Sequence, residues 1–371
     1  MRVGTASADP GETANGWLDL TKLPTGPTER APVLLANGER EGPTLWVTAA
    51  VHGDEATGLA AAQDAFDDRL AERLAGGLVV LPILNPAGLR RTARTSYYHD
   101  DDPNRYFPDP DAEQYRPPRV QEVVDERLFE AITGADEAPV ADATADALLD
   151  LHTAQVGSMP FVIRDRALYG DRRDESEAEA LSEELGALAD SLGLPVVVEY
   201  TGEEYTGEGL HRTATGAVFN EAGIPALTVE LGRHTVVDES ARARGVAACY
   251  RALDHLGALD AVPEWCPDVE PLAPPVDFRV KRAVHPHTDV AGIVRHRVEA
   301  GAVVEPGTVV ADVVSPHGTV EERVESDHDG FVLAREEGVA AYENDPVAHL
   351  AVRDDGDLIA PRDGDSTHGA S

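Results

Sequence analysis

The first two thirds of the chain alternate between short apolar runs and longer segments with helical spacing. Residues 44–51 (TLWVTAAV) and 77–85 (GLVVLPILN) are apolar runs of strand length, and the segment between them, 58–77, has helix-forming composition and periodicity. Parallel neighbouring strands need a long crossover, which is usually a helix. This order therefore predicts a largely parallel sheet covered by helices.

The same alternation continues to about residue 258. Further strands are predicted at LLDLH, which ends at His152, at LPVVVEY (194–200) and at ALTVE, which follows a turn at Gly223–Pro225 and ends at Glu230. Amphipathic helices are predicted over 175–193 and 239–259. We expect an N-terminal extension over residues 1–31 and a catalytic α/β domain over residues 32–262.

The pattern changes after residue 262. Residues 263–277 are rich in proline and predict a linker, and residues 278–354 carry short glycine-punctuated strands that predict an all-β module. Its cadence resembles the barrel-sandwich fold of biotinyl and lipoyl carriers, but no lysine follows Lys281 to carry such a group. We therefore expect an accessory or interface module, followed by a disordered tail over 355–371.

The charge balance of the chain is strongly acidic. Its 31 basic and 68 acidic residues give a net charge of −37, and only Lys22 and Lys281 are lysines. Such a field repels nucleic acid and anionic membranes, so we expect neither as a partner. Acid-rich, lysine-poor sequences resemble proteins of extreme halophiles. We favour this interpretation over a mesophilic protein with an acidic tail, because the acids are spread along the chain.

A halophilic protein of this charge should lose stability below about molar salt, because its like charges repel one another when they are not screened. We expect the melting temperature to rise with salt concentration, which calorimetry in dilute and in saturated salt would measure. Equal melting temperatures in the two conditions would refute the halophilic interpretation.

Two further features bear on location and on metal chemistry. The chain has no apolar run of 18 residues, and residues 1–16 lack the hydrophobic centre of a signal peptide, so we expect a soluble, cytoplasmic protein. The two cysteines, Cys249 and Cys266, form no CxxC pair. A zinc–thiolate site and a disulfide framework are therefore excluded.

Three residues at predicted strand ends form a candidate zinc site. His52 and Glu55 lie three residues apart directly after a strand, and His152 ends another strand 97 residues after Glu55. The carboxyl ends of strands in open α/β sheets line the ligand crevice, and catalytic zinc commonly takes three protein ligands. Taken alone, the H-x-x-E pair is also compatible with a chance surface turn, and His152 with a hydrogen-bonded core histidine.

Other polar side chains follow the same strands. Arg94, Asn104 and Arg105 lie in a loop after the strand at 77–85, where arginines can grip a carboxylate or make salt links on an acidic surface. Asp102 is a candidate partner for a histidine ligand. Glu230 ends an apolar strand, where it can act as a general base or be an exposed strand-end acid.

Four short motifs occur in a family-specific order: HGDE, NPAG…R…DPNRYFP, LLDLHTA and IPALTVELG. In this the chain resembles the succinylglutamate desuccinylase/aspartoacylase branch of zinc carboxypeptidase-like enzymes over residues 32–258. The β module resembles the C-terminal domain that many members carry. The resemblance implies a mixed, largely parallel sheet flanked by helices, with a small C-terminal barrel-sandwich-like domain.

The resemblance also implies roles for individual residues. One Zn²⁺ per chain would be held by His52, Glu55 and His152, and Glu230 would be the catalytic glutamate. Asn104 and Arg105 would hold a substrate carboxylate, with Asp102 supporting His52. Arg94 would stabilise the oxyanion; Arg90 and Arg91 are alternatives, because the stretch from Arg94 to Asn104 is longer than the family pattern.

The residues and the resemblance together predict a zinc-dependent hydrolase that cleaves the amide bond of a small anionic N-acyl amino acid. The reaction would use zinc-activated water and Glu230 as the general base. Alternatives are a metallocarboxypeptidase acting on peptides and a non-catalytic zinc-binding protein. The sequence leaves the acyl group, the amino acid and the oligomeric state open, a homo-oligomer included.

Overall fold

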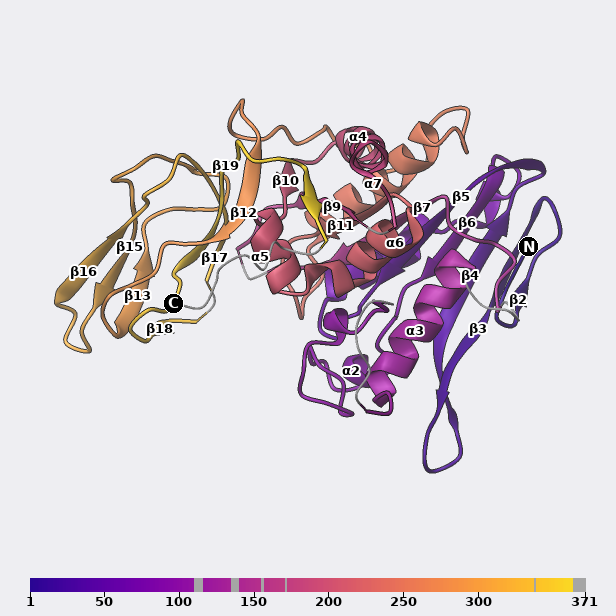
Figure 1. Ribbon diagram of the computed structural model, residues 1–371, viewed down its shortest axis with the longest axis horizontal. Helices are drawn as coiled ribbons and strands as arrows, with labels where there is room; N and C mark the ends of the chain where they lie inside the picture. The colour runs from indigo at the N-terminus through magenta and orange to yellow at the C-terminus, as the bar shows by residue number, and fades with distance from the viewer. Residues whose placement is uncertain (110–115, 135–139, 155–156, 171, 337, 363–371) are drawn as a thin grey trace.

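The computed structural model describes residues 1–109, 116–134, 140–154, 157–170, 172–336 and 338–362. Within these residues, a large mixed sheet runs through the molecule and is flanked by helices (Figure 1). Its strands lie in the order β14 (Val303–Val304), β17 (Gly330–Arg335), β19 (Ala348–Arg353), β12 (Val280–Val284), β10 (Val196–Val198), β8 (Phe161–Arg164), β11 (Ala226–Glu230), β7 (Ala147–His152), β5 (Arg40–Ala49), β6 (Ala75–Leu81), β4 (Thr28–Asn37) and β3 (Glu12–Lys22).

The strands β11, β7, β5 and β6 form a parallel block in this sheet. These strands are buried on both faces. For this reason their sequences are continuous apolar runs and do not alternate between apolar and polar residues. The helices α1 (Ala56–Ala65), α4 (Glu175–Ser191) and α7 (Glu239–His255) pack together as one group, and α3 (Val120–Thr133) and α6 (Ala214–Ala222) as another. The predicted mixed α/β fold is confirmed.

Helix ends in this region follow local capping chemistry. α4 begins with a capping box, in which the Asp174 side chain accepts from the backbone of Glu177 and the Glu177 side chain accepts in return. The Asp238 side chain caps α7. These two helices match the predicted segments to within a few residues at each end. α1 is shorter than predicted, because Phe66 is extended and Asp67 begins a separate turn.

The remaining elements are small. They are β1 (Arg2–Val3), β2 (Ala6–Ser7), β9 (Ala167–Tyr169), β20 (Ile359–Pro361), α2 (Pro86–Leu89), α5 (Gly202–Gly207), and the 3₁₀ turns η1 (Asp68–Leu70), η2 (Pro103–Arg105) and η3 (Leu210–Arg212).

The C-terminal module is all-β, as predicted. An antiparallel sheet of β16 (Val320–Glu325), β15 (Val309–Val314), β13 (Gly292–His296) and β18 (Ala340–Ala341) shares an apolar core of valine, alanine and leucine with β14, β17, β19 and β12. The second set of strands also continues the large sheet, because β12 pairs in parallel with β10. A further apolar cluster contains Phe161 and Ile163 from the α/β region and Phe331 and Leu333 from the module. The module is therefore joined to the α/β region by hydrogen bonds and by shared core.

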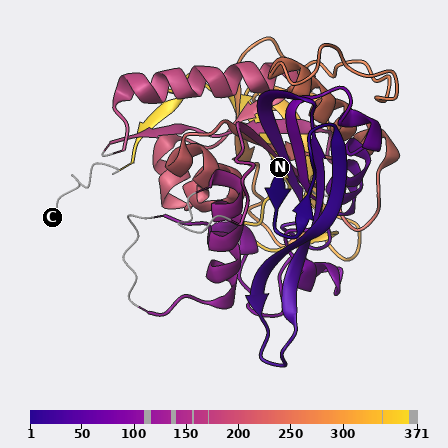
Figure 2. The same cartoon turned by 90° about the vertical axis from the view of Figure 1, so that its right-hand side faces the viewer.

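The chain ends differ from the sequence-based boundaries. The predicted N-terminal extension contains β3 and part of β4, which pair over their whole length and form one edge of the large sheet (Figure 2). The predicted disordered tail contributes β20, which pairs with β9; residues 363–371 lie outside the described residues. Both segments are polar with few apolar positions, and they form strands because a neighbouring strand supplies the hydrogen bonds.

The proline-rich segment 263–277 has neither helix nor strand, and it lies against the α/β region. Trp265, Cys266 and Leu272 pack on the main core, and the Trp265 indole donates to the Tyr250 hydroxyl at 2.8 Å. Among the described residues, no helix has the length and apolar character needed to cross a membrane.

Candidate functional site

The HGDE loop follows the end of β5 and is shaped by close backbone contacts. Ala50, the residue after the strand, has a left-handed φ of 51°, which is costly for a non-glycine residue. A Cβ on Gly53 would lie 2.1 Å from the carbonyl carbon of Gly88, and a Cβ on Gly58 would lie 2.4 Å from the carbonyl oxygen of Leu151. Only glycine fits at these two positions. At Gly53 the loop lies directly against α2, and at Gly58 the start of α1 lies directly against β7, the strand that ends at His152.

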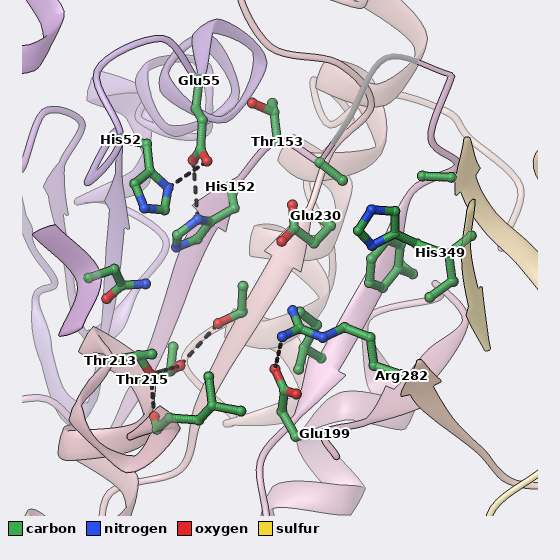
Figure 3. Close-up of a pocket in the computed structure, with 18 of the residues that line it drawn as sticks. His52, Glu55, His152, Thr153, Glu199, Thr213, Thr215, Glu230, Arg282 and His349 are labelled. Atoms are coloured by element: carbon green, nitrogen blue, oxygen red, sulfur yellow. Dashed lines mark hydrogen bonds and ion pairs between the residues drawn. The ribbon is translucent and has the colours of Figure 1, made fainter. Parts of the chain in front are cut away.

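This packing brings His52, Glu55 and His152 together, as the sequence predicts. The Glu55 carboxylate lies between the two imidazoles, with Oε1 2.7 Å from Nδ1 of His52 and Oε2 3.1 Å from Nδ1 of His152 (Figure 3). One donor atom from each residue lies within 4.8 Å of the others, and all three residues are buried. The ring centroids are 5.3 Å apart.

The outer nitrogen of each imidazole faces an aspartate. Nε2 of His52 lies 2.9 Å from Asp102, and Nε2 of His152 lies 2.8 Å from Asp150. These carboxylates orient both rings so that Nδ1 faces Glu55, which is the usual arrangement around a bound metal. Asp102 is in its predicted place. Asp150 was not predicted. The sequence could have indicated it, because residues 150 and 152 of one strand point to the same face of the sheet and an acid in an apolar strand is unusual.

The charges in this cluster support one another. Burial raises the pKa of Glu55, but the neighbouring His152 and His52 outweigh burial and leave that pKa well below its usual range. Burial likewise disfavours the charged form of His152, but Glu55 and Asp150 more than offset it and raise the pKa of this imidazole. Glu55 is therefore held as a carboxylate in a buried position.

The residues fit a zinc ion. The buried Oε2 atom of Glu55 lies 3.1 Å from Nδ1 of His152 without a hydrogen bond of good geometry, so it can serve as a ligand atom beside that nitrogen. Two imidazoles and one carboxylate are a frequent ligand set for catalytic zinc, and the aspartates behind the rings complete it.

Glu230 lies beside this cluster. It ends β11, where its Cα is paired with that of His152 on the neighbouring strand β7. The residue is partly buried, and its Oε2 atom is fully buried without a hydrogen bond. Burial raises the pKa of Glu230, and the charge of His152 lowers it. The negative charge of Glu55 raises it again, so the pKa of Glu230 lies above its ordinary value. A raised pKa brings a carboxyl closer to the range that suits a general acid–base group.

All seven predicted site residues line a single pocket of about 440 Å³. Arg94 donates to Asp102 at 2.7 Å and lies 3.8 Å from Glu55. Neither Arg90 nor Arg91 lines this pocket, and Arg90 instead pairs with Glu29. Arg94 is therefore the arginine of the three that faces the site.

Asn104 and Arg105 lie next to each other and, like Arg94, line this pocket. The amide oxygen of Asn104 accepts from the backbone N–H of Ala214 at 2.7 Å, which fixes the orientation of this buried side chain. The Arg105 guanidinium donates to the Asn104 carbonyl at 2.8 Å and lines the pocket. Asn104 and Arg105 are thus placed to act as a pair.

Several pocket residues were not predicted. They come from the ends of β8 and β10 and from the β module, and they include Asp165 and Glu336. Glu199, Arg282 and His349 belong to the same set and are labelled in Figure 3. The sequence carries a weak signal for Asp165 and Glu199, which are acids directly after apolar strands. It carries no signal for the module residues, because their approach depends on the pairing of β10 with β12.

Replacing Asp150 with asparagine should weaken zinc binding by about 10–100-fold. Asp150 accepts from Thr48 at 2.7 Å and faces His152 at 2.8 Å. An asparagine has a single acceptor oxygen, so one of these two partners would meet an N–H₂ group instead. Competition with a chelator of known affinity would measure the change. The exposed Asp146→Asn variant, four residues earlier, should bind zinc as the wild type does, and equal affinity in both variants would contradict the role of Asp150.

Comparisons with known proteins show the family to which this chain is similar. A family model described as the succinylglutamate desuccinylase/aspartoacylase catalytic domain matches residues 41–256. The N-alpha-acetyl-L-2,4-diaminobutyric acid deacetylase of Halomonas elongata is 28% identical over 242 residues. That match covers 59% of this chain and 66% of the relative, just under two thirds of its length.

Solved structures extend the likeness to the whole fold. A succinylglutamate desuccinylase/aspartoacylase from Rhodobacter sphaeroides superposes with a TM-score of 0.72 at 21% identity, covering 96% of this chain and 100% of that one. The product-bound ectoine utilization protein EutE from Ruegeria pomeroyi has a TM-score of 0.69 at 21% identity, covering 94% and 98%. The family match spans more than half of the chain and contains all seven predicted site residues, so the chain belongs to the succinylglutamate desuccinylase/aspartoacylase family, a family of deacylases.

Proposed function

We propose that this protein is a zinc-dependent hydrolase that removes the acyl group from a small N-acyl amino acid. The observation that carries the proposal is that three kinds of group line one pocket. They are the buried His52–Glu55–His152 set, the carboxyl of Glu230, and the polar wall formed by Arg94, Asn104 and Arg105. A metal site, a proton-transfer group and an anion grip are the parts that amide hydrolysis of a carboxylate-bearing substrate needs.

His52, Glu55 and His152 would hold the zinc. When bound, this ion supplies Lewis acidity, which polarises the amide carbonyl and lowers the pKa of water. Asp102 and Asp150 keep both imidazole rings in place through their outer nitrogens. The ligands are therefore fixed before substrate arrives.

Glu230 would move the proton. Its carboxylate takes a proton from the attacking water, the water oxygen bonds to the acyl carbon, and the amide C–N bond then breaks. Glu230 returns the proton to the departing amine, so the products are the free amino acid and the carboxylic acid of the acyl group, which then ionises in water. The raised pKa of Glu230 suits both halves of this transfer.

The pocket wall would position the substrate. Arg94 lies 3.8 Å from Glu55 and so can reach the oxygen of a carbonyl beside the ligand cluster, where negative charge develops. Arg105 and Asn104 would grip the substrate carboxylate with parallel hydrogen bonds. The curated relative acts on an acetylated diamino acid, which likewise has an amide and a carboxylate.

A hydrolysis panel tests the proposal. Zinc-loaded protein in molar salt would be given N-acetyl and N-succinyl amino acids beside dipeptides, with and without a chelator. We expect release of free amine from one or more of the acylated amino acids, and loss of that release in chelator. Cleavage of dipeptides alone would indicate a carboxypeptidase, and no cleavage of any substrate by zinc-loaded protein would indicate a non-catalytic zinc-binding protein.

A further inference from the structure

The pocket crosses the large sheet from the His52–Glu55–His152 set to the β module. These three residues follow or end β5 and β7, and Glu230 ends β11, the next strand in the sheet. On the other side of β11, the pocket is lined by residues of β8, β12, β17 and β19. In Figure 3, His349 of β19 and the two imidazoles of the set lie on opposite sides of Glu230. We call the part of the pocket beyond Glu230 the module side.

The module side has an apolar wall. Its apolar residues come from the end of β7 and from β8, β12 and β17; they are Ala154, Phe161, Ile163, Val284, Leu333 and Ala334. Phe161, Ile163 and Leu333 are buried and belong to one apolar cluster that joins β8 to β17. A hydrocarbon group on a ligand would gain free energy by leaving water for this wall.

A second cavity, of about 390 Å³, adjoins the module side. Val284, Glu336 and His349 line both cavities. The other apolar residues that line the second cavity are Val294, Ala340, Ala341 and Pro346. The first cavity alone, at about 440 Å³, lies in the range of about 300–1,000 Å³ that holds drug-sized ligands. The two together therefore offer more room than an N-acetyl amino acid fills.

The charges on the module side favour an uncharged ligand group. Among the described residues that line it, the basic ones are Arg282 and His349, and each faces a carboxylate. Arg282 lies 3.2 Å from Glu199, and Nε2 of His349 lies 2.7 Å from Glu336. Nε of Arg282 lacks a hydrogen bond, but Glu199 balances the charge of the guanidinium. A further carboxylate buried here would have no cation of its own, which is costly.

We propose that the module side and the second cavity bind an aliphatic acyl chain longer than acetyl, so that the preferred substrates are N-acyl amino acids with an uncharged hydrocarbon acyl group. This inference rests on the proposed deacylase function. Asp102 lies 2.9 Å from His52 and 3.9 Å from Arg105, so the group proposed to grip the substrate carboxylate lies on the metal side of Glu230. An amide is planar and trans, so its acyl chain and its amino acid extend in opposite directions from the C–N bond. The acyl chain therefore points toward the apolar wall.

A series of acyl groups on one amino acid tests this preference. The amino acid is the one released fastest in the hydrolysis panel, and it carries an acetyl, butanoyl, octanoyl or succinyl group. Each CH₂ group that leaves water completely should raise kcat/KM about fourfold. We therefore expect kcat/KM to rise at least about tenfold from acetyl to butanoyl and again from butanoyl to octanoyl. Succinyl has the same number of carbons as butanoyl, and its charge should make kcat/KM at least about tenfold lower.

Val294→Phe tests the second cavity separately. Val294 on β13 lines the second cavity but not the first, so a larger side chain there fills space beyond the shared residues. The octanoyl-to-butanoyl ratio of kcat/KM should fall at least about tenfold. Ile293→Phe is the matched control, because Ile293 precedes Val294 on the opposite face of the same strand and lines neither cavity. It should keep the wild-type ratio. A general loss of stability would lower kcat/KM for both substrates and leave the ratio unchanged.

Binding gives a readout without turnover. In a Glu230→Gln background, calorimetry with the same four N-acyl amino acids should show affinity rising from acetyl to butanoyl to octanoyl. The heat-capacity change of binding should become more negative in the same order, because more apolar surface is buried. Succinyl should bind more weakly than butanoyl.

The outcomes separate the two proposals. If no N-acyl amino acid is hydrolysed but affinity rises with chain length, the deacylase function fails and the acyl site stands. If the acetyl or succinyl derivative is hydrolysed at least as fast as the butanoyl one, the acyl site is overturned and the deacylase function stands. Should Val294→Phe not fold, the order of the four acyl groups in the wild-type protein decides alone.

Discussion

Replacing Glu230 with glutamine should lower kcat by about 10²–10⁴-fold while the protein still binds one zinc ion per chain. Glutamine has nearly the shape of glutamate but cannot accept a proton from water or return one to the amine. Glu230 lies beside His152 without being part of the His52–Glu55–His152 set, so the metal ligands remain. Steady-state kinetics and metal analysis of the same preparation would measure both quantities.

Glu29→Gln is the control for this experiment. Glu29 is also a glutamate of limited exposure, but it pairs with Arg90 and Tyr98 outside the pocket. Its replacement should cost stability and leave kcat near the wild-type value. Wild-type turnover in Glu230→Gln would remove Glu230 from the mechanism, and loss of zinc in that variant would show that it acts as a ligand instead.

Removing the metal should abolish turnover and lower the melting temperature. A ligand that binds only the folded state stabilises it by RT ln(1 + [L]/Kd), which is about 4 kcal/mol when free zinc exceeds its Kd a thousandfold. The chelated protein should regain its activity on addition of one equivalent of zinc. Calorimetry and kinetics before and after chelation would show both effects.

The His152→Ala variant should behave like the chelated protein, and added zinc should not restore it. His211→Ala serves as the comparison, because His211 also faces a carboxylate, at 3.2 Å from Asp109, but does not line the pocket. It should respond to chelation as the wild type does. Full activity of the wild-type protein after exhaustive chelation would contradict the zinc-dependent mechanism.

The β module takes part in the site more directly than the sequence suggests. Arg282 on β12 balances Glu199, and His349 on β19 pairs with Glu336 at 2.7 Å on the same pocket wall. The module is thus a wall of the pocket, and it holds the arginine that pairs with Glu199. The expectation of an accessory or interface module did not include this contribution.

The sequence by itself determined the α/β fold and the residues of the candidate zinc site. His52, Glu55, His152 and Glu230 each follow or end an apolar run, and the strands β5, β7 and β11 lie side by side in parallel. In such a block every carboxyl end comes to the same edge of the sheet. Strand identity and direction were therefore enough to bring together residues that lie 97 positions apart.

The tertiary structure alone decided the end of the pocket where Asp165, Glu199 and Arg282 lie. β8 runs antiparallel to β11, so Asp165 lies at the opposite end of its strand from the Phe161 position that faces Glu230. Arg282 approaches only because β12, beyond the linker, pairs with β10. Cross-strand neighbours depend on strand order, direction and register, and none of these is encoded in the residues within one strand. For that reason the candidate zinc ligands could be predicted from local motifs, whereas the placement of Glu199 and Arg282 in the same pocket required the folded chain.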